Sequence, residues 1–386
     1  MKNILILVIL TFSTFLAFGQ NIKDIQIKRQ KAFAIKNVNV ITMNATGTFI
    51  ENATVVISDN IIQSINGSIP KKAIIIDGKG KWLIPGLIDA HVHLPTDGYF
   101  GQKLPTQIPD LSFDMQDIMT PIIANGVTTV LDLNSTMETF GQKKAIEKGY
   151  IVGPRIALAA NINGDNGQGK IANTAEEGRI MVRIAKAEGY DFIKVYSKLN
   201  IETYNAIIDE AHKQGLKTIG HIPNAIEGKL EQAFVPHFGM VAHAEEFSKH
   251  SENFSIEDAQ KFAKLSKDNG TYLSPTLTTM VWIANQTNSI DSIKNSPTLK
   301  YVHPLLQSKW LTANNYNKNF TVKNLGYLEE MVKFHFLLVK VFKDAGVPIM
   351  AASVDHRLCC GERRLFDKAG DGVDAGFCGG GRATLD

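Results

Sequence analysis

The sequence predicts a (β/α)8 barrel that follows a small β domain. After residue 82, eight short apolar runs recur, and most of them follow a segment of helical periodicity that ends at a glycine. Strands that alternate with helices imply parallel pairing and right-handed crossovers. No Gly-x-Gly-x-x-Gly motif follows any of these runs, so a closed barrel fits better than an open doubly wound sheet. The 386 residues leave room for a barrel, which needs about 250.

The first 31 residues differ from the rest of the chain. Lys2 precedes an apolar and hydroxylic run over 4–18, and Ala17-Phe18-Gly19 has a small-x-small cleavage pattern. We therefore expect 1–19 to be a secretory signal peptide and 20–31 a polar tether. The protein is then periplasmic or secreted, with no stable membrane span after cleavage. The alternative is an uncleaved N-terminal anchor.

The next segment, 32–82, contains short alternating runs rich in Ile and Val, separated by Asn, Asp and Gly turns. This pattern is typical of a small antiparallel sheet, and we expect a β-sandwich domain here. The barrel is expected over 83–356. Its predicted strands lie at 83–92, 126–133, 153–160, 191–196, 216–221, 240–243, 271–277 and 346–350.

The predicted barrel helices have clear start and stop signals. The helix over 174–189 ends in glycine, as does the helix over 202–215, and Ser255 is a favoured N-cap residue for a helix over 256–270. A further helix is expected near 328–345. The long segment 281–326 is a candidate lid over the site.

Charge and cysteine content exclude several classes of function. The formal net charge is +3 and no basic cluster with interleaved aromatic residues occurs, so nucleic acid is not an expected partner. Cys359, Cys360 and Cys378 are the three cysteines of the chain. A metal bound in the body of the protein must therefore use ligands other than cysteine.

Histidines stand at the ends of several predicted strands. His91 and His93 end the first run and point to the same face, because side chains alternate along a strand. Alone, this pair is equally well explained as a polar strand end. His221 and His243 end two later runs, and catalytic groups of such barrels lie at the carboxyl ends of the strands. We expect these imidazoles to form one metal site. Five other histidines are expected to be structural or solvent-facing: His212, His237, His250, His303 and His335.

Lys194 is unusual because it stands within the apolar run Phe-Ile-Lys-Val-Tyr. Burying an ammonium group in a barrel strand is costly. Alternatively, the aliphatic part of the side chain extends to the mouth of the barrel, so that the ammonium group reaches solvent.

These motifs resemble those of the amidohydrolase superfamily, in particular its imidazolonepropionase-related branch of metal-dependent hydrolases. The resemblance extends over residues 32–352. Its most specific motif is Pro-Gly-Leu-Ile-Asp-Ala-His-Val-His, and Gly-Val-Thr-Thr-Val, Gly-Pro-Arg, Asp-Phe-Ile-Lys-Val and Ala-Gly-Val-Pro-Ile-Met support it.

The resemblance implies a site for two divalent metal ions. His91 and His93 would bind the first ion and His221 and His243 the second, while Lys194, carboxylated by carbon dioxide, would bridge the two. Nitrogen and oxygen ligands without sulfur favour zinc, with manganese, iron or cobalt as alternatives.

The resemblance also implies a mechanism, in which a hydroxide shared by the metals attacks an amide, dipeptide or cyclic amide carbonyl. An aspartate would bind the first metal and transfer the proton to the leaving amine as general acid/base. Asp355 is the candidate, although it comes one residue later than in the family's Gly-Thr-Asp pattern. Tyr196 would point into the same mouth and hydrogen-bond the substrate carbonyl, or it would simply pack there. The expected partner is a small-molecule or dipeptide-like substrate. The sequence is also compatible with a homo-oligomer.

The segment 357–386 is rich in Gly, Arg, Asp and Cys and has little apolar periodicity. We expect a frame-shifted or truncated terminus, with the C-terminal half of the small β domain missing; a divergent lineage is the alternative. Two other functions therefore stay open. One is a mononuclear amidohydrolase that opens a ring or deaminates, against which Lys194 argues. The other is a defective or non-catalytic product.

Overall fold

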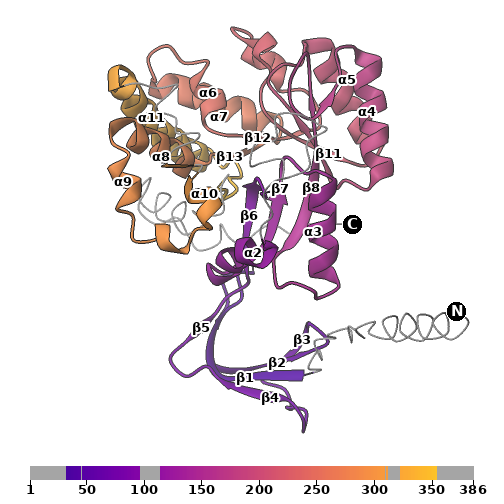
Figure 1. The fold of residues 1–386 in the computed structure, drawn as a ribbon, viewed down its shortest axis with the longest axis vertical. Helices are drawn as coiled ribbons and strands as arrows, with labels where there is room; N and C mark the ends of the chain where they lie inside the picture. Colours follow the sequence, from indigo (N-terminus) through magenta and orange to yellow (C-terminus); the bar gives the residue numbers. More distant parts are fainter. Residues whose placement is uncertain (1–31, 45, 96–113, 309, 312–321, 354–386) are drawn as a thin grey trace, which may run out of the picture. The chain divides into compact units, whose positions relative to one another are not determined.

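The computed structural model describes residues 32–353, except for 45, 96–113, 309 and 312–321. They form a small N-terminal sheet and a barrel of parallel strands surrounded by helices (Figure 1). Predictions for 1–31, and for Asp355 and 357–386, fall outside the described residues.

The N-terminal sheet has five strands in the order β3-β2-β1-β4, with β5 paired to β1. The strands are β1 (Ala32–Ile41), β2 (Phe49–Ser58), β3 (Ile61–Ile65), β4 (Ile74–Asp77) and β5 (Trp82–Leu83). β2 and β3 pair antiparallel, but β1 and β5 pair parallel. The predicted antiparallel pairing therefore holds for β2 and β3 but not for β1 and β5. Because β1 and β5 are separated by three other strands, the connection is long enough for parallel pairing.

The barrel strands follow one another in the sheet in the order of the sequence. They are β6 (Leu87–Val92), β7 (Val127–Asp132), β8 (Arg155–Asn163), β10 (Phe192–Val195), β11 (Lys217–Gly220), β12 (Phe238–Ala242) and β13 (Tyr272–Ser274). A short strand, β9 (Lys170–Ile171), pairs with β8. All neighbouring barrel strands are parallel, as predicted.

The segment that follows the last helix occupies the eighth position of the ring. On one side, the Met350 amide donates to the Leu273 carbonyl at 2.8 Å, and the Leu273 amide donates to Pro348 at 3.1 Å. On the other side, the Ala90 amide of β6 donates to the Ala351 carbonyl at 3.0 Å. The predicted (β/α)8 barrel is confirmed.

The helices connect successive strands. They are α2 (Met115–Ala124), α3 (Met137–Glu147), α4 (Ala175–Glu188), α5 (Ile201–Lys213), α6 (Glu245–Ser248), α7 (Ile256–Asp268), α8 (Leu277–Asn288), α9 (Asp291–Lys294), α10 (Pro304–Ser308) and α11 (Leu325–Asp344). In the part of the chain that the structure describes, the short 3-10 turns are η2 (Asn224–Ile226), η3 (Leu230–Ala233), η4 (Leu299–Tyr301) and η7 (Val322–Asn324). Within the described residues, none of the helices combines the length and the apolar composition of a bilayer-crossing segment.

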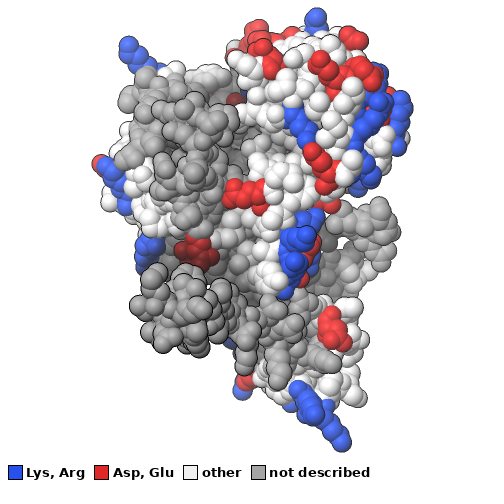
Figure 2. Space-filling view, turned by 45° about the vertical axis from the view of Figure 1, so that its right-hand side comes forward, with Lys and Arg blue, Asp and Glu red and all other residues white. Residues whose placement is uncertain are grey.

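Helix ends follow the predicted signals. Ser255 caps α7 by accepting the Asp258 amide at 3.1 Å, and Gly189 ends α4 with a left-handed φ of 89°. The described part of the candidate lid contains most of α8 and all of α9 and α10, and its role stays a prediction. Acidic and basic side chains are interspersed over the outer surface of the barrel in Figure 2. Between α4 and α5, Arg183 and Glu210 form an ion pair at 2.9 Å.

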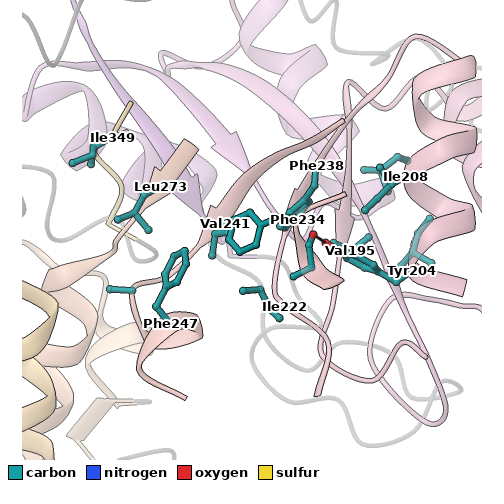
Figure 3. Close-up of a cluster of buried hydrophobic side chains, with 14 of the residues drawn as sticks. Val195, Tyr204, Ile208, Ile222, Phe234, Phe238, Val241, Phe247, Leu273 and Ile349 are labelled. Carbon is teal, nitrogen blue, oxygen red and sulfur yellow. Dashed lines mark hydrogen bonds between the residues drawn. The ribbon is translucent and has the colours of Figure 1, made fainter. Parts of the chain in front are cut away.

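The main hydrophobic core lies between the barrel strands and the helices that cover them (Figure 3). Val195, Val241 and Leu273 contribute to it from the strands, and Tyr204 and Phe247 from the helices. Phe247 packs against three other rings, those of Phe234, Phe262 and Phe342. The hydroxyl of Tyr204 is not left unpaired, because it donates to the Ala233 carbonyl at 2.8 Å.

A buried carboxylate joins the first barrel strand to the last segment. Asp89 in β6 is 1% exposed. Its Oδ1 accepts the amide of His91 at 3.1 Å and that of Ser353 at 3.0 Å, and its Oδ2 accepts the Ser353 hydroxyl. The hydrogen bonds of Asp89 therefore hold the barrel closed between β6 and the last segment, next to His91 and His93.

We expect Asp89→Ala to lower the free energy of unfolding by about 2–3 kcal/mol, because two buried amides lose their acceptor. Urea denaturation followed by circular dichroism measures the change. Asp344→Ala, which removes an exposed partner of Lys340 on α11, is the control and should cost less than about 1 kcal/mol. If Asp89→Ala were as stable as the control Asp344→Ala, the hydrogen bonds of Asp89 would not be needed to close the barrel.

Candidate active site

Four imidazole rings meet at the carboxyl ends of the barrel strands. His91 belongs to β6, and His93, His221 and His243 directly follow β6, β11 and β12. The ring centroids of His91 and His243 are 4.6 Å apart, those of His221 and His243 are 4.9 Å apart, and those of His91 and His93 are 5.1 Å apart. The structure thus brings the predicted histidine ligands together.

The spacing of the first pair suits a shared metal ion. The Nε2 atoms of His91 and His93 lie 3.2 Å apart. Two nitrogens bound to one tetrahedral zinc would be about 3.3 Å apart. In addition, the Nδ1 atom of His91 is buried and has no hydrogen-bond partner. The distance between the Nε2 atoms fits a pair of ligands that converge on one ion.

Histidine, cysteine, aspartate and glutamate side chains alone do not complete such a site. Within the described residues, no group of three or more of them could hold an ion. The predicted set also includes Lys194, and Asp355 lies outside the described residues.

Lys194 in β10 is the most unusual member of the cluster, since it is only 1% exposed. Burial lowers its pKa from 10.5 to about 7, although the carboxylates of Asp132 and Glu246 act in the opposite direction. Near neutral pH, a large share of the amine is therefore uncharged. An uncharged amine is a nucleophile, whereas an ammonium group is not.

Three of the imidazoles are also held in their neutral form. Burial, reinforced by the charges of neighbouring His and Lys groups, keeps the pKa of His91 and that of His243 well below the ordinary 6.5. Burial likewise lowers the pKa of His221, against the effect of the Glu246 carboxylate. Neutral imidazole is the form that binds a metal.

Two side chains that sequence reasoning missed orient the histidines of the second pair. The Nδ1 atom of His221 lies 2.7 Å from Glu246 Oε1, and the Nδ1 atom of His243 lies 2.7 Å from Thr276 Oγ1. His243 and Thr276 both have a left-handed backbone, with φ of 85° and 48°, which is costly for residues with a side chain. The two consecutive glutamates after His243 were the available sequence signal for the first contact.

Asp132, at the end of β7, is a third residue that the sequence reasoning missed. It is fully buried, and burial raises its pKa to about 6. Its Oδ1 accepts the amides of Leu94 at 3.4 Å and Asn134 at 3.3 Å, whereas its Oδ2 has no hydrogen-bond partner. Asp132 thus ties the residue after His93 to the neighbouring strand.

Tyr196 lies beside the cluster, as predicted. Its ring centroid is 4.2 Å from that of His221, and Lys194 Nζ is 4.9 Å from the centre of the Tyr196 ring. Histidines predicted to be structural or solvent-facing have other partners. His335 of α11 is buried against Ser248, and His212 stacks on His237 at 3.5 Å.

The sequence profile of the amidohydrolase family matches residues 82–310, more than half of the chain. The chain belongs to the amidohydrolase family. The imidazolonepropionase-related branch stays a prediction.

Curated relatives of this amidohydrolase match only in part. A 5-methylthioadenosine/S-adenosylhomocysteine deaminase from Halalkalibacterium halodurans is 37% identical over 65 residues, which are 16% of this chain and 15% of that protein. A protein of the same description from Halothermothrix orenii is 28% identical over 191 residues, which are 40% of this chain and 43% of that protein. The chain therefore spans less than half the length of these relatives.

Solved structures match over most of the chain. A Xaa-Pro dipeptidase with bound methionine has a TM-score of 0.61 and 20% identity, over 88% of this chain and 84% of its own. A bottromycin amidohydrolase has a TM-score of 0.63 and 18% identity, over 90% of this chain and 75% of its own. At these identities, the comparison shows that the amidohydrolase shares their fold.

We expect Lys194→Met to stabilise the metal-free protein. Because burial lowers the folded pKa from 10.5 to about 7, the unfolded chain binds the proton more tightly than the folded one. The resulting penalty is full below pH 7 and disappears as the pH rises toward 10.5. The variant should gain a few kcal/mol at pH 6 to 7, and the gain should shrink above that range. Urea denaturation in a chelator at several pH values measures it. A gain that did not change with pH would mean that Lys194 titrates normally.

Proposed function

We propose that this amidohydrolase hydrolyses the carbon–nitrogen bond of an amide, dipeptide or cyclic amide, with two divalent metal ions, zinc being the favoured metal. One observation carries the proposal: the amine of Lys194 is buried with a pKa near 7 beside four imidazoles. A structural lysine would gain nothing from this position, because burial penalises its charge.

The residues fit the proposed metals. His91 and His93 would hold one ion, and His221 and His243 the other, with Lys194 between them. When bound, the ions would supply Lewis acidity and lower the pKa of water. Nitrogen donors without thiolate suit zinc.

Lys194 would join the two ions after it has reacted with carbon dioxide. The Nζ lone pair forms a bond to the carbon, one C=O π pair moves to oxygen, and Nζ releases one proton to water. The product is a carbamate anion with two oxygens. A buried cation is thereby replaced by an anion, which offsets the charge of divalent ions.

Two further side chains would act on the substrate. Asp355 would accept a proton from the attacking water and deliver it to the leaving amine. The Tyr196 hydroxyl would donate a hydrogen bond to the substrate carbonyl oxygen, where negative charge develops. The apolar strands around the cluster would exclude bulk water, which strengthens both interactions.

A deaminase with a single metal is the second candidate. Its support is the partial match to proteins described as deaminases. A single metal needs no bridging carbamate, so the burial of Lys194 favours the two-metal hydrolase. We also propose, from the apolar run over 4–18 alone, that the protein is exported.

Zinc content tests the role of Lys194. The metal-free protein is incubated with zinc and bicarbonate, desalted and analysed by mass spectrometry. We expect two zinc ions per wild-type chain and at most one in Lys194→Ala, because the bridging anion is lost. Lys213→Ala, which removes an exposed lysine of α5, is the control and should retain two. Two ions and full activity in Lys194→Ala would rule out the carbamate.

Product analysis tests the reaction class and the role of Tyr196. The zinc-loaded protein is offered dipeptides, N-acyl amino acids, cyclic amides and adenosine analogues. We expect release of an amine or amino acid, and release of ammonia from the adenosine analogues would favour the deaminase. Tyr196→Phe should lower kcat at least about 10-fold at unchanged zinc content, since only the hydroxyl is removed. An unchanged kcat would leave Tyr196 a packing residue.

A further inference from the structure

Both carboxylate oxygens of Glu246, on α6, have hydrogen-bonding partners. The residue is 1% exposed. Its Oε1 lies 2.7 Å from His221 Nδ1 and accepts a hydrogen bond from Lys249 Nζ at 2.9 Å. Its Oε2 accepts the amide of Ile222 at 3.1 Å. Lys249 Nζ and the Ile222 amide thus each donate to one oxygen of this buried carboxylate, and His221 Nδ1 lies against the oxygen that accepts from Lys249.

These contacts decide which nitrogen of His221 carries the proton. An ionised carboxylate can only accept hydrogen bonds. Both oxygens of Glu246 already accept hydrogen bonds, from Lys249 Nζ and from the Ile222 amide, so the contact with His221 is made by a hydrogen on Nδ1. In a neutral imidazole, Nε2 is then left with its lone pair.

We propose that Glu246 is a positioning residue that holds His221 with its proton on Nδ1, so that Nε2 can bind a divalent ion. The inference rests on the proposed function, in which His221 is a ligand. A carboxylate behind a ligating imidazole also raises its basicity. Glu246 would therefore strengthen the site as well as orient it.

The helix that carries Glu246 is fixed from the other side. The next residue, Phe247, packs against Phe342 with ring centroids 5.1 Å apart and against Phe262 at 5.4 Å, as part of the core in Figure 3. Ser248 Oγ lies 3.1 Å from Nε2 of the buried His335 on α11. Since α6 has only four residues, these anchors leave Glu246 little freedom to move away from His221.

The Nδ1 atoms of His221 and His243 contact side chains of different charge. His243 Nδ1 contacts the neutral hydroxyl of Thr276, whereas His221 has a carboxylate held by an ammonium group. We expect loss of Glu246 to weaken the metal that His221 and His243 share, and to leave the pair His91 and His93 unchanged.

Nitrogen NMR on metal-free protein with 15N-labelled histidine tests the proton position directly. His221→Asn identifies the signal. In the wild type, His221 should show a protonated Nδ1 and an unprotonated Nε2. In Glu246→Ala the Nε2–H form should dominate, because free imidazole favours it, and Glu246→Gln should partly retain the wild-type form through its amide oxygen.

Competition between zinc and a chelating dye supplies the second measurement. One of the two zinc affinities should fall about 10–100-fold in Glu246→Ala and less in Glu246→Gln. Glu210→Gln is the matched control, because Glu210 is also buried and paired with Arg183, but on the outer helix α5. It should change neither the histidine signals nor the zinc affinities.

The outcomes separate the two proposals. A wild-type His221 that carries its proton on Nε2 overturns the positioning role, as does an unchanged zinc affinity in Glu246→Ala. A wild-type protein that binds no zinc but has His221 protonated on Nδ1 contradicts the proposed function and supports the contact on which the positioning role is based.

Discussion

Burial of the Lys194 amine beside four imidazoles is the constraint on which the site depends. Burial opposes the charge of Lys194, His91, His221 and His243, and charges on neighbouring groups would repel one another. Near pH 7 much of the cluster is therefore uncharged and rich in lone pairs. In the proposed two-metal site, divalent cations and a bridging anion would offset the cost of burying these groups.

The barrel makes this costly arrangement possible, because its closed ring fixes the strand ends. Asp89 is central to that fixation. One of its oxygens accepts the amide of His91 and the amide of Ser353, so the carboxylate that closes the ring also sets the backbone of a proposed ligand. Around the ring, Asp132 and Glu246 act similarly on the segments that carry His93 and His221. Three buried carboxylates thus fix the segments that carry the proposed ligands.

Much of the fold could be predicted from the sequence, because alternating strand and helix patterns leave few topologies. The placement of His91, His93, Lys194, His221 and His243 at one end of the barrel followed from their positions at strand ends. The parallel pairing of β1 with β5 could not be predicted, since alternation determines which side chains face the core but not the direction of the partner strand. Glu246, Thr276 and Asp132 were missed for a related reason. Their contacts join residues 25 to 38 positions apart, and no periodicity in a single strand or helix encodes them.

The central claim is that Lys194 lies between two metal ions held by the two pairs of histidines. Anomalous diffraction at the zinc edge, from crystals of the protein grown with zinc and bicarbonate, tests this claim most directly. The account predicts two zinc peaks, one at His91 and His93 and one at His221 and His243, with additional density on the Nζ atom of Lys194 that connects them. A single peak, or two peaks with an unmodified Lys194, would contradict it.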